Sequence, residues 1–276
     1  MKKVGTSVPP YAKCTGICRV GFRAHHKTAR TDSMNNYKEA VRLISGSNYI
    51  VAFTGAGISV ESGIPTFRGA DGLWSKYDPK VLDIDFFTAH PEESWRTIKE
   101  IFYDYMGSHA RPNRAHYFLA ELEKRGILKG IITQNIDHLH QAAGSRNVIE
   151  FHGTAQRLVC MECGASYDLA QIDLGKLPPF CSACGGLLKP DFVFFGEPIP
   201  PYAYERSIAL TENADVYLII GTTGEIMPAS QIPYLAREAK VIEINIEPSN
   251  YTKSLTDLFL QERATIVAEK LEALLR

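Results

Sequence analysis

Hydrophobic positions along the chain follow two different periods. Short apolar runs, bounded by polar or glycine-rich segments, predict buried strands at residues 49–53, 130–134, 148–151, 215–220 and 240–246. Apolar residues at helical spacing predict helices over residues 34–45, 113–126 and 262–275. Asn113 and Gly126 are suited to begin and end the middle helix. Strands that alternate with helices predict an α/β fold whose parallel sheet is covered on both faces.

A polar segment follows each of four predicted strands at the point where the strand ends. These segments are TGAGIS (54–59), TQNID (133–137), GTTG (221–224) and NIEP (245–248). Ligands of open parallel sheets bind beyond the carboxyl ends of the strands. The convergence of the four segments therefore predicts a ligand site at this edge, although the order of the strands does not follow from it.

The loop after the first predicted strand has the sequence FTGAGISVESGIPTFRG. Gly55 and Gly57 allow close approach of a ligand, and amides in such a turn can point at phosphate oxygens. Val60 stands where the usual dinucleotide fingerprint has a third glycine, so a turn without a ligand stays an alternative for the glycines alone. The SGIP that follows interrupts any helix, and Phe67 and Arg68 add an aromatic ring and a cation. A plain dinucleotide-binding turn would not need them.

Cysteines mark a second module. Cys160 and Cys163 form one CxxC pair, Cys181 and Cys184 form another, and 17 residues separate the pairs. This spacing predicts a four-cysteine zinc ribbon inserted at about residues 153–192. Disulfides or a redox-active pair are the alternatives. Four thiolates leave no open position for a water, so the zinc is expected to be structural.

The first 33 residues differ from the rest of the 276-residue chain. They carry seven basic residues and one acidic residue, whereas the remainder has 23 basic and 30 acidic residues, a net charge of −7. We expect residues 1–33 to be a disordered extension or upstream translated sequence, with Cys14 and Cys18 as free thiols and the fold beginning near Met34. An acidic body argues against nucleic-acid binding.

No apolar run approaches the length of a membrane span. The longest, VYLII, is strand-sized, whereas a span needs about 18 residues or more. The composition, 45% hydrophobic and 22% charged, is typical of a globular protein. We expect a cytoplasmic monomer that does not bind membranes.

One histidine has a position that suggests chemistry. His152 follows a predicted strand and lies on the side of the sheet where the polar segments gather. Although a single histidine is more often structural, this position favours a functional role. The other histidines of the body are expected to be structural or have no special context: His90, His109, His116, His138 and His140.

Several motifs together identify a family. GAGISVESGIPTFRG, TQNIDHLH, FHG, the CxxC pairs, KPDFVFFGE and the GTT and NIE turns occur in this order. Over roughly residues 35–275 the chain resembles the sirtuins, the silent-information-regulator class of NAD-dependent protein deacylases. The resemblance implies one catalytic domain over residues 34–275. It would have a Rossmann-type large domain, the inserted zinc module, and a cleft where NAD meets an acyl-lysine protein.

The resemblance also implies the reaction. The acyl oxygen attacks the nicotinamide ribose and nicotinamide leaves. His152, as general base, activates a ribose hydroxyl that attacks the resulting imidate. The catalytic set is His152, Asn135 and Asp137. Asp137 would face the carboxamide of nicotinamide and Phe67 would shield the intermediate.

Further site residues are carried over from the same motifs. NAD would contact Gly55, Ala56, Gly57, Ser59, Thr66, Phe67, Arg68, Trp74, Gln134, Asn135, Ile136, Asp137, Gly221, Thr222, Thr223, Asn245, Ile246, Glu247 and Ala264. The substrate would contact Ile98, Ile101, Val193, Phe194, Phe195, Gly196 and Glu197, with residues 193–197 as an exposed edge that pairs with the peptide backbone.

Acyl preference follows from two of these positions. The sirtuins that remove succinyl groups hold the acyl carboxylate with a Tyr-x-x-Arg motif, and Ile98 and Ile101 occupy those positions here, counted from Trp95. A buried carboxylate without a cation is strongly disfavoured. We therefore expect acetyl-lysine, or a longer fatty acyl group, to be preferred over succinyl-lysine.

The sequence departs from the family's pattern at one place, and three alternative functions remain open. Gly224 and Glu225 follow GTT where the family usually has hydrophobic residues. Glu225 either faces solvent or favours basic residues beside the substrate lysine. The alternative functions are mono-ADP-ribosyl transfer to a protein, NAD-linked dehydrogenation with a structural zinc, and nucleic-acid binding by the zinc ribbon. The last is opposed by the acidic body, and the dehydrogenase by the lack of a Tyr-x-x-x-Lys motif.

Overall fold

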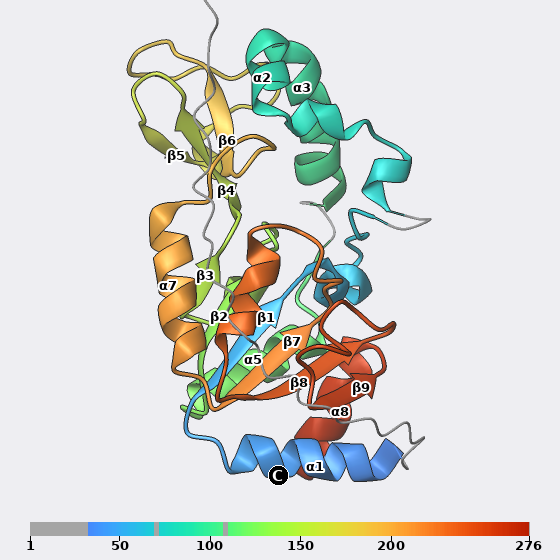
Figure 1. Cartoon of the computed structure of the whole chain (residues 1–276). Helices are drawn as coiled ribbons and strands as arrows, with labels where there is room; N and C mark the ends of the chain where they lie inside the picture. The colour runs from blue at the N-terminus through green and yellow to red at the C-terminus, as the bar shows by residue number, and fades with distance from the viewer. Residues whose placement is uncertain (1–32, 69–71, 107–109, 276) are drawn as a thin grey trace, which may run out of the picture. The chain divides into compact units, whose positions relative to one another are not determined.

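Six parallel strands form the main sheet in the order β3-β2-β1-β7-β8-β9 (Figure 1). The computed structural model describes residues 33–68, 72–106 and 110–275. The strands are β1 Ile50–Thr54, β2 Leu128–Thr133, β3 Val148–Glu150, β7 Val216–Ile220, β8 Lys240–Asn245 and β9 Leu258–Gln261. This is the strand order of the dinucleotide-binding doubly wound fold, which confirms the predicted Rossmann-type sheet. The sequence analysis missed β9.

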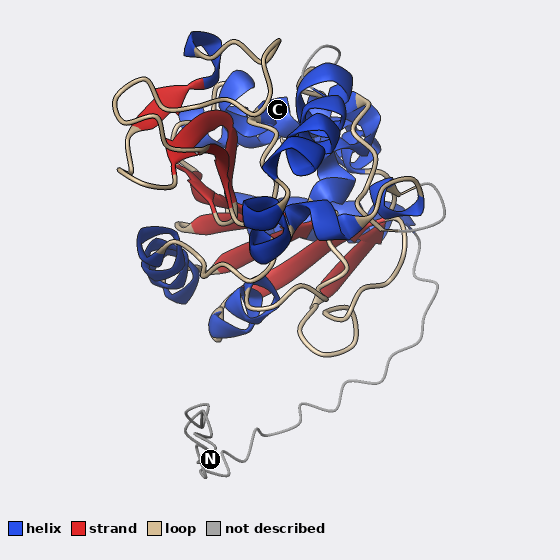
Figure 2. Ribbon diagram, turned by 90° about the horizontal axis from the view of Figure 1, so that it is seen from above, coloured by secondary structure: helices blue, strands red, loops and turns tan. Residues whose placement is uncertain are grey.

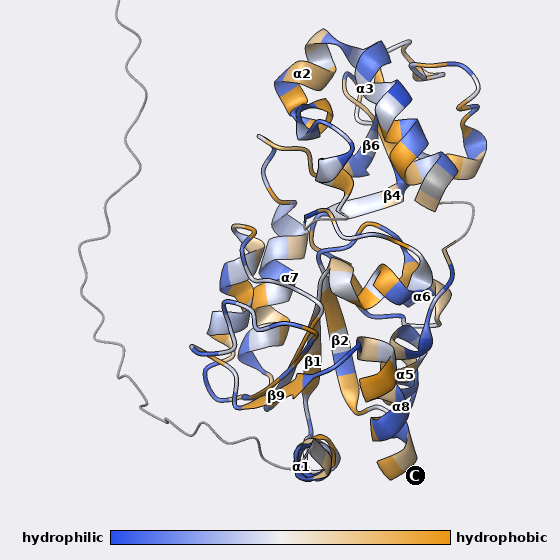
Figure 3. Cartoon of the chain, turned by 90° about the vertical axis from the view of Figure 1, so that its right-hand side faces the viewer, coloured by the Kyte–Doolittle hydropathy of each residue, from blue (hydrophilic) through white to orange (hydrophobic). Residues whose placement is uncertain are grey.

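Helices cover both faces of this sheet (Figure 2). Alternate residues of β1 point to opposite sides, so that Ile50 and Ala52 pack in one core and Val51 and Phe53 in another. The first core contains α1 Ser33–Ser45, α5 Arg114–Lys124 and α8 Ala264–Leu274. The second contains α7 Pro201–Glu212 and the 3-10 helix η6 Ala229–Leu235. The strands are mostly hydrophobic, as Figure 3 shows, because both faces are buried.

A smaller antiparallel sheet has the order β5-β4-β6. Its strands are β4 Gly153–Cys160, β5 Ser166–Asp168 and β6 Leu188–Phe192, followed on the β5 side by the short 3-10 helix η5 Leu169–Gln171. They share a third core with a helical segment made of η2 Leu73–Ser75, η3 Pro79–Leu82, α2 Ile84–Ala89, α3 Pro91–Ile98 and the π-helix η4 Lys99–Tyr105. The second and third cores are therefore built partly from helices, α7 and residues 73–105, that the sequence analysis missed.

Several expectations concern residues outside the described ranges. The N-terminal arm with Cys14 and Cys18 is one of these, and His109 is another. The described residues belong to one compact unit. None of the helices in the described ranges has the length and apolar character that a bilayer crossing requires.

Candidate functional site

Two glycine turns meet where the strand order changes direction, between β1 and β7. The Gly57 amide donates to the Gly221 carbonyl oxygen at 2.8 Å. A Cβ atom on Gly57 would lie 2.7 Å from the Cα of Gly221, and Gly221 itself has φ +64°. Only glycine fits this approach and this backbone conformation. The two turns therefore lie side by side at the switch point, where doubly wound sheets bind ligands.

The loop after β1 begins as a short 3-10 helix, η1 Ala56–Ser62. It ends at Gly63, which has φ +88°, so the predicted interruption of the helix by SGIP is confirmed. The side chain of Asn113 donates to the Ile58 carbonyl oxygen at 2.7 Å and to Ser62 Oγ at 2.9 Å. This anchor fixes the loop against the start of α5 and turns the following residues toward the smaller sheet.

A polar network lies beneath the two turns. Ser59 Oγ donates to Asp137 Oδ2 at 2.7 Å, and Asn135 Nδ2 donates to Ser59 Oγ at 3.1 Å and to the Gly55 carbonyl oxygen at 3.2 Å. Burial raises the pKa of Asp137, although hydrogen bonds from the Leu139 amide and from Ser59 oppose it. The amide and carboxyl groups of Asn135 and Asp137 are thus held rigidly at the end of β2.

Two histidines that the sequence analysis treated as structural or without context stand directly behind this network. His116 is fully buried and His140 is 1% exposed, and their rings lie 4.9 Å apart. His116 Nε2 lies 3.5 Å from Ser59 Oγ, and His140 Nε2 lies 2.9 Å from Thr54 Oγ1. Burial lowers the pKa of both, that of His116 to about 4. The Asn-x-x-His spacing, which forms a capping box on α5, was the sequence signal for His116.

His152 lies between β3 and β4, partly buried. Its Nδ1 is 3.1 Å from the Gln134 carbonyl oxygen. A carbonyl oxygen can only accept, so Nδ1 carries the proton and Nε2 keeps its lone pair. Burial lowers the pKa of His152 and the bond to Gln134 partly offsets this. A neutral imidazole with a fixed tautomer is suited to accept a proton near pH 7.

The turns after β7 and β8 are joined to the same region. Gln134 Nε2 donates to Thr222 Oγ1 at 3.0 Å, and Asn245 Nδ2 donates to the Thr222 carbonyl oxygen at 3.1 Å. Three further residues expected at the cofactor lie on the outside of these turns and are exposed: Thr223, Ile246 and Glu247. The first turn of α8, which begins at the half-buried Ala264, is tied to η1 by the hydrogen bond from Thr265 Oγ1 to Glu61, at 2.7 Å.

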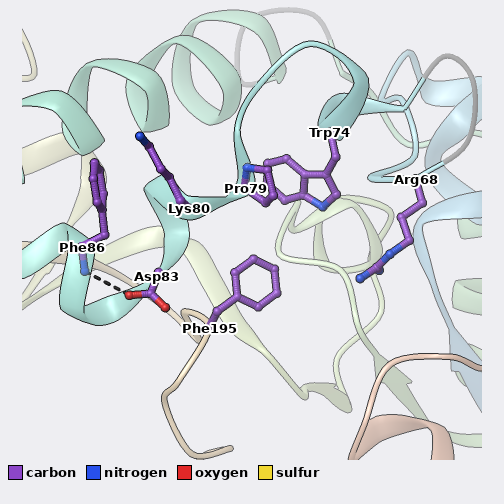
Figure 4. A pocket seen from close by; sticks show the side chains of 7 residues that line it. All are labelled: Arg68, Trp74, Pro79, Lys80, Asp83, Phe86 and Phe195. Carbon is purple, nitrogen blue, oxygen red and sulfur yellow. Dashed lines mark hydrogen bonds between the residues drawn. The ribbon is translucent and has the colours of Figure 1, made fainter.

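A cavity of about 630 Å³ adjoins the loop (Figure 4). Arg68 and Lys80 are on its wall, and the rings of Trp74, Phe86 and Phe195 line it. Trp74 lies 6.5 Å from Phe195 between ring centroids. Two other residues expected at the cofactor, Thr66 and Phe67, precede Arg68 and are half-buried. The Phe67 ring packs on Trp74, with 5.5 Å between ring centroids. The Thr66 hydroxyl donates to the Arg68 carbonyl oxygen.

The residues expected to contact substrate divide into two groups. Ile98 and Ile101 are 0% and 1% exposed and belong to the third core. Phe194 is also buried, at 1% exposed, because it packs edge-on against Phe87. The expectation that residues 193–197 form an exposed edge therefore needs correction for the Phe194 side chain. Phe195 and Gly196 are exposed, while half-buried Val193 donates its amide to the His152 carbonyl oxygen at 2.9 Å.

The four cysteines of the smaller sheet fit a zinc ion. All four Sγ atoms lie within 4.8 Å of one another. Cys160 and Cys184 are 3.5 Å apart and Cys163 and Cys181 are 3.7 Å apart, between sulfur atoms. Tetrahedral zinc with four thiolates at about 2.3 Å requires sulfur atoms about 3.8 Å apart. A hydrogen bond with the Tyr167 hydroxyl, at 3.0 Å, lowers the pKa of Cys181 to about 6, which favours the thiolate.

Comparisons with known proteins agree with this geometry. A family model described as Sir2 family matches residues 55–228. An "NAD-dependent protein deacylase 2" of Pyrobaculum aerophilum is 47% identical over 235 residues, covering 83% of this chain and 92% of its own. An "NAD-dependent protein deacetylase 1" of the same organism is 44% identical over 239 residues, covering 84% and 92%.

Solved structures give the same result. A Sir2 homolog–NAD complex is 38% identical, with a TM-score of 0.80, and covers 90% of this chain and 96% of its own. A Sir2–p53 peptide–NAD+ complex is 36% identical, with a TM-score of 0.78, and covers 86% and 97%. With the strand order, the glycine turns and the cysteine cluster, these matches show that the chain belongs to the Sir2 family.

Proposed function

We propose that the chain is an NAD-dependent protein-lysine deacetylase, which transfers the acyl group of a substrate lysine to ADP-ribose and releases nicotinamide. The observation that carries this is the position of His152. Its Nε2 is unprotonated, because Nδ1 donates to the Gln134 carbonyl oxygen, and it stands at the strand-end region of the Ser59–Asn135–Asp137 network. A fixed base beside rigid amide and carboxyl groups suits a reaction that removes a proton from a sugar hydroxyl.

The residues have separate roles in this proposal. NAD, when bound, supplies an electrophilic ribose carbon. Asn135 and Asp137 orient the nicotinamide end, and Asn135 cannot rotate away because Ser59 and the Gly55 carbonyl oxygen hold its amide. The turn of residues 55–57 presents backbone amides to the phosphates. His152 accepts the proton of the ribose hydroxyl on Nε2.

Zinc has a structural role in this proposal. Cys160, Cys163, Cys181 and Cys184 would hold the ion, and their closed set of thiolates leaves no position for substrate. The ion would join two turns, the one after β4 and the one before β6, at the end of the sheet where Cys160 pairs with Leu188. Its contribution is to fix the smaller sheet, from which the segment 193–197 extends.

Acetyl-lysine is the proposed substrate in preference to succinyl-lysine. The support is that Ile98 and Ile101 lie buried among apolar residues, so these positions offer no cation for an acyl carboxylate. Burying a carboxylate without a partner is unfavourable.

A longer acyl chain is the second candidate. The cavity beside Arg68 is the observation that favours it, because Trp74, Phe86 and Phe195 present apolar rings to a space of about 630 Å³. Acyl-lysine peptides with acetyl, octanoyl and myristoyl groups would separate the two candidates by their kcat/KM values.

The cellular setting is also part of the proposal. The described cysteines form no disulfide and gather as metal ligands, which suits a reducing compartment such as the cytoplasm. We propose that the protein acts as a monomer, which light scattering on a size-exclusion column would test.

Product analysis tests the proposed function. Incubation with NAD and an acetyl-lysine peptide is expected to give nicotinamide, deacetylated peptide and O-acetyl-ADP-ribose in equal amounts, measured by mass spectrometry. Adenine-labelled ADP-ribose that stays on protein would instead indicate ADP-ribosyl transfer. Appearance of NADH would indicate a dehydrogenase.

A further inference from the structure

A buried lysine lies at the end of the smaller sheet, outside the site described above. Lys189 of β6 is 6% exposed. Its Nζ donates to the carbonyl oxygens of Pro190 at 2.9 Å and Phe192 at 2.7 Å, and it forms an ion pair with Glu197 at 3.0 Å. All three donors of the ammonium group are therefore used. Lysine is rarely buried in this way unless its charge is paired.

All the partners of Lys189 belong to the eight residues that follow it. Glu197 also accepts a hydrogen bond from the Phe194 amide at 2.8 Å, and the ammonium lies 4.2 Å from the centroid of the Phe194 ring. The chain thus folds around one cation between Pro190 and Glu197. Burial lowers the pKa of Lys189, while Glu197 raises it. The pairing of Lys189 with Val159 of β4 is a backbone pairing that requires no charged side chain, whereas the side-chain partners of Lys189 all lie in the segment that follows it.

The segment held by Lys189 connects the candidate site to the cavity. At its beginning, the Val193 amide donates to the His152 carbonyl oxygen at 2.9 Å. At its middle, the Phe195 amide donates to the Leu82 carbonyl oxygen at 2.8 Å, and the Phe195 carbonyl oxygen accepts from the Ile84 amide at 3.0 Å. The Phe195 ring then projects into the cavity opposite Trp74 (Figure 4).

We propose that Lys189, through its pair with Glu197, is a positioning residue for acyl-peptide binding. The pair fixes the path of residues 193–197 and so sets where Phe195 and the backbone beside His152 meet the substrate. The ligand that this segment recognises is a neutral N-acyl-lysine in an extended peptide, and the inference rests on the proposed deacylase function. In the described part of the chain, the side-chain hydrogen bonds and ion pair of Lys189 and Glu197 join them to each other and to Pro190, Phe192 and Phe194, so the expected effect is on the peptide.

A purely structural role for Lys189 makes a different prediction. Leu188, its neighbour, pairs with Cys160, so a lysine that only stabilised β6 would affect zinc retention and every kinetic constant together. A positioning role affects peptide binding and the order of residues 193–197 alone.

The test compares Lys189→Met, which removes the charge, with Lys189→Arg, which keeps it. For Lys189→Met the KM for an acetyl-lysine peptide is expected to rise roughly 10- to 100-fold, because small displacements of positioning groups have effects of this size. The KM for NAD and the zinc content per chain are expected to stay at wild-type values. Lys189→Arg is expected to recover most of the peptide affinity.

Hydrogen exchange gives a readout that does not depend on activity. The amides of Phe194 and Glu197 are expected to exchange faster in Lys189→Met, whereas the amides of β4 keep their protection. Unchanged hydrogen exchange together with an unchanged peptide KM would overturn the proposal. A loss of zinc accompanied by a rise in the KM for both peptide and NAD would also overturn it. If Lys189→Met fails to fold, hydrogen exchange is measured on Glu197→Gln, which keeps a side-chain acceptor for the Phe194 amide; unchanged exchange in residues 193–197 of that variant would overturn the proposal.

The two proposals fail separately. A wild-type protein that cleaves no NAD with any acyl-lysine peptide would end the proposed function, and with it the substrate named here. If the wild-type protein is active and Lys189→Met has the same peptide KM, only the positioning role is refuted.

Discussion

Acidification is expected to destabilise the fold through the buried histidines behind the candidate site. His116 is fully buried, and burial lowers its pKa from 6.5 to about 4. In the unfolded chain this histidine takes up a proton near pH 6.5, whereas in the folded protein it does so only near pH 4. Between these values the unfolded state binds more protons, so the free energy of unfolding falls as the pH falls.

The size of the effect follows from the two pKa values. Between pH 7 and pH 5 the difference in proton uptake by His116 corresponds to about 2 kcal/mol of unfolding free energy. His140, whose pKa burial also lowers, acts in the same direction. A loss of this size is a large part of the stability of a typical domain, which is about 5–15 kcal/mol.

Denaturant unfolding of the zinc-loaded protein at both pH values measures this loss. In His116→Asn, which keeps an acceptor for the amide that caps α5, the loss between pH 7 and pH 5 is expected to be smaller by about 2 kcal/mol. The exposed His90 is the matched control, and His90→Asn should behave like the wild type. An equal loss of unfolding free energy in the wild type and in His116→Asn would refute this explanation. Protonation of the zinc ligands affects both proteins alike, so it does not contribute to the difference between them.

Three further predictions concern separate parts of the molecule. Tyr167→Phe removes the hydrogen bond to Cys181 Sγ and is expected to weaken zinc binding roughly 10-fold or more, measured by competition with a chromophoric chelator; unchanged affinity would show that the hydroxyl has no effect. Arg68→Ala is expected to abolish NAD cleavage while the melting temperature stays unchanged, because the residue is exposed; an active variant would contradict its assignment to the cofactor. Wild-type protein is expected to deacylate acetyl-lysine peptides about 10-fold faster than succinyl-lysine peptides, because Ile98 and Ile101 offer no cation, and faster desuccinylation would contradict this.

The parts of the structure that depend on local spacing were predictable from the sequence. The four cysteines of the two CxxC pairs come together because each pair needs only one tight turn. Five of the six parallel strands of the main sheet, all except β9, were visible as apolar runs because both faces of the sheet are buried. The interruption of η1 at Gly63 was likewise readable, since a positive φ favours glycine.

Elements with an atypical buried face were missed. The buried residues of α7 are Ala203, Ser207, Leu210 and Thr211, two of which are polar, so the helix has only a weak apolar stripe. Ser207 Oγ is satisfied by the Ala203 carbonyl oxygen one turn earlier, and Thr211 Oγ1 lies 3.1 Å from a buried tyrosine hydroxyl. These hydrogen bonds form only in the folded chain, so the sequence of α7 lacks the hydrophobic period that would predict a buried helix.

Part of the candidate site also depends on tertiary contacts. His116 is buried because distant residues, Ser59 and His140, pack against it, and its own sequence neighbours do not show this. Phe194 was expected to face substrate but lies in the third core beside Phe87. The motif by itself does not give the direction of each side chain, because that direction depends on the packing of α2 and β6.

Peptide-dependent turnover of NAD to O-acetyl-ADP-ribose tests the central claim most directly. The wild-type protein and His152→Ala would be incubated with NAD, each with and without an acetyl-lysine peptide, and O-acetyl-ADP-ribose and free nicotinamide would be measured over time. The wild type is expected to release nicotinamide only with the peptide. His152→Ala is expected to turn over about 10²- to 10⁴-fold more slowly, as for loss of a general base. Peptide-dependent turnover that persists at the wild-type rate in His152→Ala would contradict the role of His152 as the base.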